Sequence, residues 1–431
     1  MTSRRHIGLY YASIRWVSVL RHWAESATAV GSGRAFREKL HQAVSSDFAG
    51  KAAFALGSGR GALATVLRAA DIGPGATVVL SSYTCLAVPT AVVSVGATPI
   101  YVDIDPATLN VTTSDTIRAF GPGVRAVVVQ HTLGKPAPIE EIAAAARQRG
   151  ILVIEDCALA IGSTINGRQV GTFGDAAIFS MELSKTLSCG WGGILLVNDA
   201  VLAGHVDEVY GSLPEQAWWS STRDAWQTAI SAWCHQPETS EAVRRWIFRL
   251  AFKSRLFRPS TPAGEFHGLV SPKFTRKMGT AQAAFAVSQW SRRASVERAC
   301  AANGAVLRRV LTELGLAVLG APSVGEVSVA PRVSWLVSDR EMAIQYFRDR
   351  GIELGRWFDG PLSPRPTARV FNYRFDGFPR ATSVARVVVN LPSHDRLDEA
   401  DLDRIATVLR DFVTEHPNCA VEAGQLRGTI A

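Results

Sequence analysis

The chain has 431 residues, which at roughly 100 to 200 residues per domain is enough for two or three domains with a large buried core. Hydrophobic residues make up 47% and charged residues 19%, a globular composition that excludes a mainly disordered or fibrous protein. The formal net charge of +8 is compatible with phosphates, an acidic membrane surface or nucleic acid, and it does not choose among these partners.

The six cysteines are scattered along the chain without a CxxC pair. This spacing predicts neither a zinc ribbon nor a dense disulfide framework, so we expect no metal site, and reduced thiols suit a cytoplasmic protein. Near the N-terminus Arg15 interrupts a short apolar run, and no signal peptide is expected there.

Residues 77–102 carry no charge over 26 positions, which is long enough for a membrane span. The polar residues 81–84 together with Pro89, Gly96 and Pro99 divide this stretch into a strand, a loop, a short helix and a second strand. We therefore expect a buried α/β unit here rather than a membrane helix.

Short β-rich runs alternate with helical patterns between residues 50 and 200, which predicts a mostly parallel sheet flanked by helices on both faces. In such folds ligands bind at the carboxyl ends of the strands. The expected strands are 77–80, 98–102, 126–130, 152–155, 176–180 and 193–197, and the expected helices are 61–70, 89–95 and 139–148.

The remainder of the chain has a different pattern of predicted helices and strands from this α/β part. In the C-terminal third, 280–314 predicts one long helix, 327–337 and 383–391 predict strands, and 341–350 and 399–414 predict helices. The expected division is an N-terminal helical segment (1–50), the large α/β domain (51–200), a Trp-rich basic helical insertion (201–279), and a connecting helix with a smaller C-terminal α+β domain (280–431).

The first candidate site segment is Gly57-Ser-Gly-Arg-Gly61, which directly precedes a helical run. Closely spaced glycines at a helix N-terminus let backbone N–H groups approach a phosphate. The spacing differs from a dinucleotide fingerprint and from a P-loop, and no strong strand is expected before it. A tight turn before a helix explains the segment equally well on its own.

Two apolar strands further along end in polar residues. The run 151–154 leads into Glu155 and Asp156, where a carboxylate can hold a cation, a metal or a protonated ring nitrogen, or can cap a helix. The run 176–179 leads through Ser180 to Lys185, and a desolvated lysine can act as an amine nucleophile or bind phosphate. A phosphate cradle, an acid and an amine are together the parts that pyridoxal 5′-phosphate (PLP) requires.

The ordered series of these segments resembles the DegT and StrS group of PLP-dependent sugar aminotransferases. The resemblance implies a fold-type I PLP enzyme, usually a homodimer whose active sites are built from both subunits. It is carried by residues 57–63, 82–84, 96–99, 102–105, His131, Gly134, Pro136, 154–158, 171–175, 179–185 and 192–193, and more faintly by 282–284 and 391–394.

The resemblance also implies roles for particular residues of this chain. Lys185 forms the Schiff base with PLP and moves the proton between cofactor and substrate carbons. Asp156 pairs with the pyridinium nitrogen and keeps it protonated. The phosphate is held by the Ser180 hydroxyl and by the backbone of Gly59, Arg60 and Gly61.

Four cofactor-site positions depart from the usual pattern of the family. Cys85 stands where an aromatic residue usually stacks on the cofactor ring, which makes Tyr83 another stacking candidate. Leu159 stands where Gln or His is usual near the phenolic oxygen, and Arg60 replaces a phosphate-loop Thr for which its guanidinium can substitute. Residues 274–277 replace the usual Asn-Tyr-Arg of the segment that reaches the partner subunit's phosphate.

The implied activity is transfer of an amino group from an amino acid, L-glutamate by resemblance, to a keto group on a nucleotide-linked sugar or related cyclitol. The retained Lys185 argues against the family's dehydratase branch. The alternatives are a PLP enzyme of another reaction type, dehydration or condensation, and a non-catalytic membrane-associated homologue. Asp103, Asp105 and His131 match family positions, but turn acids and a hydrogen-bonded core histidine explain them better, and no catalysis is assigned to them.

Residues 244–258 contain six cations, no acid and eight apolar residues. This composition suits a helix that packs its apolar side on the protein while its arginines stay in water. It also suits an interfacial helix on an anionic membrane, so peripheral membrane contact through 244–258 is the second interpretation. No nucleic-acid-binding motif accompanies the stretch, and no nucleic-acid partner is expected.

Overall fold

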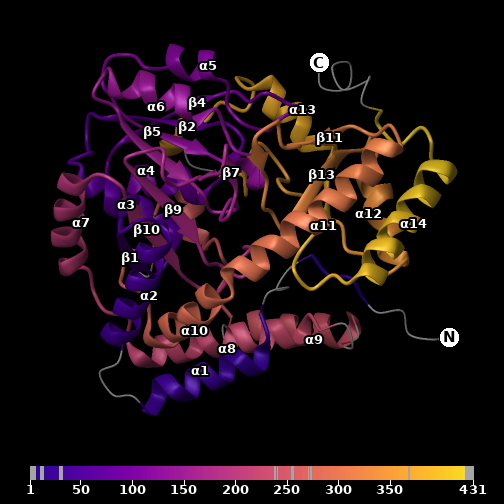
Figure 1. Ribbon diagram of the computed structural model, residues 1–431, viewed down its shortest axis with the longest axis horizontal. Helices are drawn as coiled ribbons and strands as arrows, with labels where there is room; N and C mark the ends of the chain where they lie inside the picture. The colour runs from indigo at the N-terminus through magenta and orange to yellow at the C-terminus, as the bar shows by residue number, and fades with distance from the viewer. Residues whose placement is uncertain are drawn as a thin grey trace.

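The computed structural model describes residues 6–9, 14–28, 33–236, 239, 241–253, 257–269, 271, 274–366 and 369–422. Its larger part is built on a seven-stranded sheet with the order β1-β10-β9-β6-β5-β2-β4 (Figure 1). Every strand of this sheet runs parallel to the others except β10, which pairs antiparallel with both β9 and β1. The strands are β1 (Ala52–Leu56), β2 (Thr77–Ser81), β4 (Thr98–Val102), β5 (Val124–Gln130), β6 (Leu152–Asp156), β9 (Ala176–Ser180) and β10 (Gly193–Val197).

Helices cover this sheet and form most of the remaining structure. They are α1 (Trp16–Thr28), α2 (Gly33–Asp47), α3 (Gly59–Ala69), α4 (Ala87–Ser94), α5 (Thr113–Arg118), α6 (Ile139–Arg147), α7 (Ala200–Ser212), α8 (Trp218–Cys234), α9 (Glu241–Lys253), α10 (Thr280–Ser291), α11 (Arg293–Glu313), α12 (Arg340–Asp349), α13 (Pro379–Val387) and α14 (Glu399–Glu415). The short strands are β3 (Thr84–Cys85), β7 (Thr164–Ile165), β8 (Arg168–Gln169), β11 (Val318–Leu319), β12 (Glu326–Val327), β13 (Arg332–Leu336), β14 (Leu362–Ser363) and β15 (Val388–Pro392).

The central sheet is buried on both faces. Successive side chains of a strand point to opposite faces, so Val78 and Leu80 pack with α3, α4 and α7, whereas Val79 packs with α6. On this second face, the side chains of β9 and β10 pack against α1, α2, α8 and α10. Burial of both faces explains why these strands are continuous apolar runs, and the predicted mostly parallel sheet flanked by helices is confirmed.

The C-terminal part has a core of its own. Its antiparallel sheet, β11-β13-β15, packs with α11, α12 and α14 around Trp335, Phe347 and Phe412. The rings of Trp335 and Phe412 lie 5.9 Å apart in an edge-to-face arrangement. This smaller α+β unit follows the large sheet in sequence, and the domain boundaries 1–50, 51–200, 201–279 and 280–431 stay a prediction.

Several connections join the C-terminal part to the rest of the chain, including the antiparallel pairing of β12 with β7. Strand β14 pairs in parallel with β3, which places Ser363 opposite Cys85. At the other end of the chain, Ile7 bridges to Ile352, and residues 351–353 exchange backbone hydrogen bonds with it. Segments that are distant in sequence therefore meet at the carboxyl edge of the large sheet.

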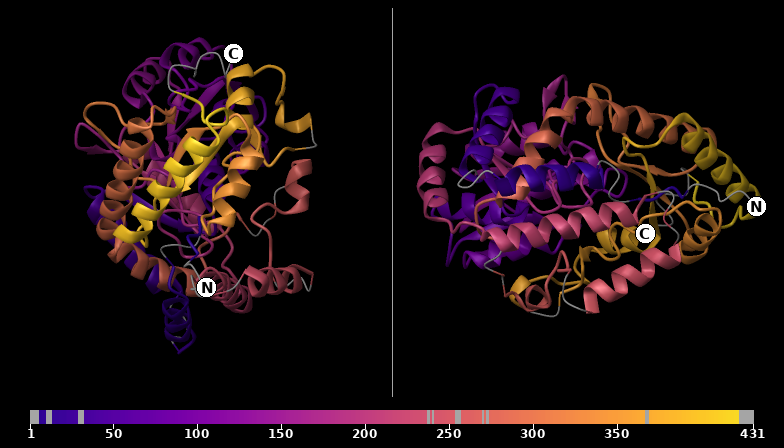
Figure 2. Two further views of the ribbon diagram at one scale, coloured as in Figure 1. Left: turned by 90° about the vertical axis from the view of Figure 1, so that its right-hand side faces the viewer. Right: turned by 90° about the horizontal axis from the view of Figure 1, so that it is seen from below.

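Helices α1, α8 and α9 lie along the lower edge of Figure 1, and Figure 2 shows α1 beside α8 and α9 extending beyond the end of α8. The rings of Trp23 on α1 and Trp226 on α8 pack at 5.5 Å. Across the part of the chain that the structure describes, none of the helices combines the length and apolarity that crossing a membrane needs. The uncharged residues 77–102 form β2, β3, α4 and β4, as predicted.

Several predicted element boundaries are wrong. Residues 383–387 belong to α13 and not to a strand, because Pro379 starts a helix whose Ala381, Val384 and Ala385 form one buried face. Only 332–336 of the predicted strand 327–337 joins the C-terminal sheet, after Pro331. The helix predicted over 280–314 is divided at Arg292 into α10 and α11.

A strand also precedes the glycine segment, where none was expected. Strand β1 ends at Leu56 and leads directly into Gly57. Its sequence, Ala-Ala-Phe-Ala-Leu, has low β propensity, so the local pattern is weak. Pairing with β10 and packing of Phe54 and Leu56 in the core stabilise it instead.

Candidate active site

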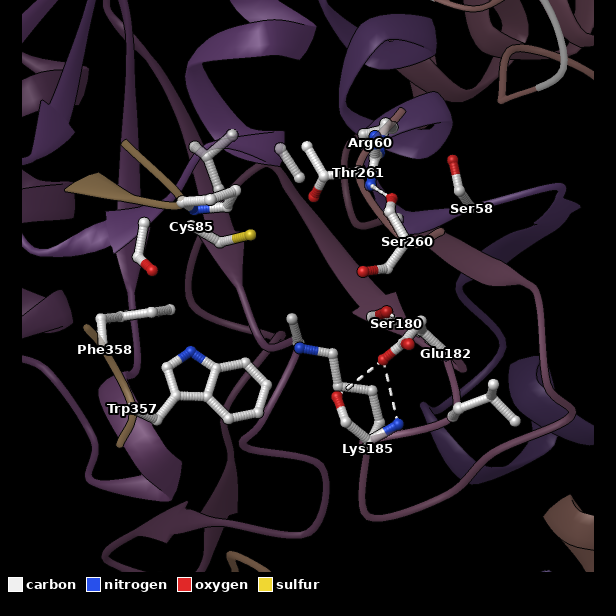
Figure 3. Close-up of a pocket in the computed structure, with 18 of the residues that line it drawn as sticks. Ser58, Arg60, Cys85, Ser180, Glu182, Lys185, Ser260, Thr261, Trp357 and Phe358 are labelled. Atoms are coloured by element: carbon white, nitrogen blue, oxygen red, sulfur yellow. Dashed lines mark hydrogen bonds between the residues drawn. The ribbon is translucent and has the colours of Figure 1, made fainter. Parts of the chain in front are cut away.

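A cavity of about 780 Å³ lies at the carboxyl ends of β6 and β9 (Figure 3). The first turn of α3, the loop after β9 and segments of the C-terminal part form its walls. Six residues predicted for the site line this cavity: Gly59, Arg60, Cys85, Asp156, Ser180 and Lys185. Gly61 and Leu159 are buried next to the cavity and are not part of its lining.

Lys185 lies in the loop between β9 and β10, and its ammonium projects into the cavity with Trp357 and Glu182 nearby (Figure 3). Burial lowers the pKa of Lys185, with Arg332 acting in the same direction. The nearby Glu182, Cys85 and Asp156 oppose this shift but do not cancel it. A larger fraction of this lysine is therefore a neutral amine at a given pH than for a lysine in water.

Asp156 is the last residue of β6 and is 5% exposed. Its Oδ1 accepts a hydrogen bond from the Ala158 amide at 2.9 Å. Burial raises the pKa of Asp156, and the Ala158 amide, Lys185 and His131 only partly offset the rise. A buried carboxylate of this kind is stabilised by a cation placed against it, which a protonated ring nitrogen provides.

The N-terminus of α3 forms an anion cradle beside these two residues. Ser58 is the N-cap, and its Oγ accepts from the Gly61 amide at 3.0 Å. The Gly61 donor is therefore already engaged, and the amides of Gly59 and Arg60 are the first-turn donors that line the cavity. Ser180 lies next to Gly59, where a side-chain carbon on the glycine would be 3.4 Å from the serine Cβ. Two amides and a hydroxyl suit a phosphate at a helix N-terminus.

Gly61 has a packing role that the sequence did not predict. A Cβ at this position would lie 2.0 Å from the Phe274 carbonyl oxygen. We expect Gly61→Ala to lower the free energy of unfolding by about 1 to 3 kcal/mol, because the Phe274 backbone must move. Urea denaturation measures this change. Gly204→Ala on α7 is the matched control, since no atom would lie within 4 Å of its Cβ, and an equal loss in both variants would contradict the argument.

The Arg60 guanidinium contacts Ser260, Glu265 and Phe274. It forms an ion pair with the buried Glu265, donates to the Ser260 carbonyl at 2.7 Å and stacks 4.1 Å from the Phe274 ring. The structure thus gives the Arg60 side chain a different partner from the predicted phosphate. Its contacts hold the segment that covers the α3 N-terminus.

Residues 274–277 contact this chain's own glycine segment. The Gly57 amide donates to the Arg276 carbonyl at 2.8 Å, and Lys277 bridges to Leu56. The resemblance implied that this segment serves the partner subunit. In the structure of the single chain it buttresses the cradle of the same subunit.

The two candidates for stacking on the cofactor ring, Cys85 and Tyr83, and the phenolic-oxygen position, Leu159, lie in different places. Cys85 lines the cavity, whereas Leu159 is 9% exposed in a core cluster with Tyr83 and Phe358. Tyr83 is fully buried, donates to the Trp357 carbonyl at 3.0 Å and accepts from the Phe358 amide at 2.8 Å. Tyr83 therefore supports the cavity wall from behind.

Trp357 is the main site residue that sequence reasoning missed. Its ring centre lies 4.8 Å from Lys185 Nζ and 3.8 Å from the Arg332 guanidinium carbon. Its backbone is held on both sides, because its amide donates to Asn390 Oδ1 at 2.8 Å and its carbonyl accepts from Tyr83. Trp357 lies in an irregular segment outside every motif, so only the fold brings it to Lys185.

His131, Asp103 and Asp105 have structural partners. His131 Nδ1 accepts from the Ala137 amide at 3.0 Å, so Nε2 carries the proton and donates to Glu155 at 3.0 Å. Glu155 also accepts from the amides of residues 171, 173 and 174, each at 2.7 Å. Although His131, Glu155 and Cys157 lie close enough to suggest a metal site, the ligand atoms of the first two already have hydrogen-bond partners. Asp103 accepts from the first turn of α13, and Asp105 from the Ala107 amide.

The basic stretch 244–258 does not form one continuous face. Residues 244–253 belong to α9, whereas Arg258 forms an ion pair with the buried Asp224 and lies 4.5 Å from the Trp191 ring. Burial lowers the pKa of Arg258 to about 10. Arg244 lines the cavity, with Nη1 3.1 Å from His6 Nε2. Residues 254–256 lie outside the described residues.

The sheet order and the cavity at its carboxyl edge define a fold-type I architecture. Two solved structures share the fold. The aminotransferase TlmJ from Streptoalloteichus hindustanus has a TM-score of 0.70 and 21% identity, covering 95% of this chain and 99% of that chain. Spr1654 from Streptococcus pneumoniae, solved in its PLP form, has a TM-score of 0.71 and 16% identity, covering 95% and 99%.

Residues 23–223 match the model of the DegT/DnrJ/EryC1/StrS aminotransferase family. The dTDP-4-dehydro-2,3,6-trideoxy-D-glucose 4-aminotransferase of Saccharopolyspora spinosa is 41% identical over 148 residues, which is 34% of this chain and 38% of the relative. The L-glutamine:scyllo-inosose aminotransferase of Streptomyces griseus is 36% identical over 172 residues, 40% and 41% of the two chains. The chain thus spans about two fifths of the length of these relatives, and the predicted family resemblance is confirmed.

Proposed function

We propose that this chain is a PLP-dependent aminotransferase that moves an amino group from an amino acid such as L-glutamate to a keto group on a nucleotide-linked sugar or related cyclitol. One observation carries the proposal: an amine of lowered pKa, a buried carboxylate and a helix N-terminus line a single cavity. The chemistry of these donors fits PLP, which offers an aldehyde, a ring nitrogen and a phosphate to them.

When bound, PLP supplies a ring that accepts the electrons left on a substrate carbon after its proton departs. Lys185 would hold the cofactor covalently through its amine and, once released, would move the proton between the substrate carbon and the cofactor carbon. Asp156 would keep the ring nitrogen protonated, and the Gly59 and Arg60 amides with the Ser180 hydroxyl would hold the phosphate. Trp357 excludes water from Lys185 and walls the space for the substrate.

The proposal also includes the class of the amino-group acceptor and the oligomeric state of the protein. A sugar aminotransferase and a cyclitol aminotransferase among the relatives support a keto-sugar nucleotide or cyclitol acceptor. The family resemblance supports a homodimer, which a mass measurement in solution tests. All six cysteines are free thiols, which supports a cytoplasmic location.

The absorption spectrum of the purified protein tests the cofactor and donor together. We expect a yellow band after addition of PLP, and loss of this band on addition of L-glutamate as the amino group moves to the cofactor. If L-glutamate leaves the band unchanged, PLP is the cofactor, but the amino donor is another compound or the reaction is not amino transfer. A protein that stays colourless with excess PLP would overturn the proposal.

A further inference from the structure

The surface formed by α1, α8 and α9 carries an unusual concentration of exposed apolar side chains. Ten of the fifteen exposed large hydrophobic residues among the described positions belong to these three helices. The Phe252 ring packs on Phe248 and Phe257, so we leave it out and call the other nine residues the tryptophan face: Trp16, Val17, Trp218, Trp219, Trp226, Trp233, Val243, Trp246 and Leu250. Exposed apolar side chains concentrated in one part of a protein surface indicate an interaction site.

Helix α8 is amphipathic, but its polar side is buried and its tryptophans are exposed. Its buried side consists of small and polar residues, including Asp224, Gln227 and Thr228. Its exposed side carries Trp219, Trp226 and Trp233, which recur every seven residues and so share one face. A helix that hides polar groups and exposes tryptophans is built for surroundings less polar than water.

Helix α9 has apolar residues on two sides, and one of these sides packs on the rest of the protein. Phe248 packs on the rings of His235 and Phe257 at 5.6 and 5.7 Å, and Ala251 is buried. The opposite side exposes Val243, Trp246 and Leu250 at the spacing i, i+3 and i+7. Trp246 and Leu250 are 65% and 53% exposed, so this second ridge faces outward among the described residues.

The charge on α9 indicates which partner suits the ridge. The sequence of α9 contains four cations and one acid, Glu241 at its start, and Arg249 and Lys253 are exposed beside Trp246 and Leu250. We propose that the tryptophan face docks peripherally on an anionic lipid bilayer. Tryptophan is favoured at the membrane–water interface, and nearby cations are attracted by anionic head groups. A two-fold contact of this face with a second copy would instead set the α9 cations against each other.

Vesicle flotation of the full-length protein tests this docking. We expect the protein to float with vesicles that contain phosphatidylglycerol, to bind vesicles of phosphatidylcholine alone much more weakly, and to release as salt is raised. The double substitution Arg249→Glu and Lys253→Glu should lower the partition coefficient by roughly 30-fold or more, about fivefold for each cation lost. Trp246→Ser with Leu250→Ser should lower it by roughly tenfold or more.

Matched variants separate docking at this face from general effects. Arg149→Glu with Arg298→Glu changes the net charge equally on exposed cations elsewhere, and Val201→Ser with Val324→Ser removes exposed apolar groups elsewhere. Both controls should float like the unaltered protein. Failure of the unaltered protein to float, equal floating of all variants, or a change of oligomeric mass in the Trp246 and Leu250 variant without vesicle binding would each overturn the inference. None of these outcomes involves the cavity, so the proposed aminotransferase activity is tested separately.

Discussion

Replacing Lys185 by alanine is expected to lower the rate of amino transfer by at least about 10⁴-fold. The variant loses both the nucleophile that holds the cofactor and the base that moves the proton, and proton transfer alone contributes about 10² to 10⁴. The substitution is not expected to unfold the protein, because burying the ammonium already lowers its pKa and so costs stability. Single-turnover conversion of bound PLP by L-glutamate measures the effect.

Two further variants distinguish chemistry from structure at this position. Lys185→Arg keeps a cation near Trp357 but cannot become neutral, so it should be as inactive as the alanine variant. Added methylamine should restore part of the rate to Lys185→Ala, because a free amine can carry the proton. Lys51→Ala, which removes a lysine bonded to the Asn198 carbonyl away from the cavity, is the control expected to keep full activity. A Lys185→Ala rate above about a tenth of the original would contradict the assignment.

Replacing Asp156 by asparagine is expected to lower the rate by about 10² to 10³, because the cofactor ring loses the charge that keeps its nitrogen protonated. Stability should move in the opposite direction. Burial raises the pKa of Asp156 above its unfolded value, so the ionised carboxylate destabilises the fold at pH values above its folded pKa. Without PLP, the neutral asparagine should therefore be at least as stable as aspartate at neutral pH.

The readouts for Asp156 are the half-reaction rate and the urea midpoint of the PLP-free protein. Asp175→Asn is the matched control, since Asp175 directly precedes β9 at the opposite edge of the sheet and accepts from the Val153 amide at 2.8 Å. That variant should lose stability and keep the rate per folded molecule. An Asp156→Asn variant that loses stability while keeping its rate would identify Asp156 as a structural residue.

Much of the sheet was predictable because its strands are apolar runs separated by turns. The strands ending at Asp156 and Ser180 were placed to within one residue, and their order along the chain placed both residues at the ligand-binding edge. Strand β1 was missed because its alanines carry little β preference and its pairing with β10 lies more than a hundred residues away. Local sequence cannot show a long-range pairing of that kind.

The amino-acid sequence by itself determined the α/β class, the resemblance of residues 23–223 to an aminotransferase family and the ordered polar residues Asp156, Ser180 and Lys185, because hydrophobic periodicity and short motifs are local properties. Only the tertiary structure decided that Trp357 covers Lys185, that Gly61 is closed off by Ser58 and Phe274, and that Arg60 pairs with Glu265. Only the tertiary structure also showed that α8 turns its tryptophans outward. These features are contacts or exposures that arise when segments distant in sequence pack together, so local sequence does not determine them.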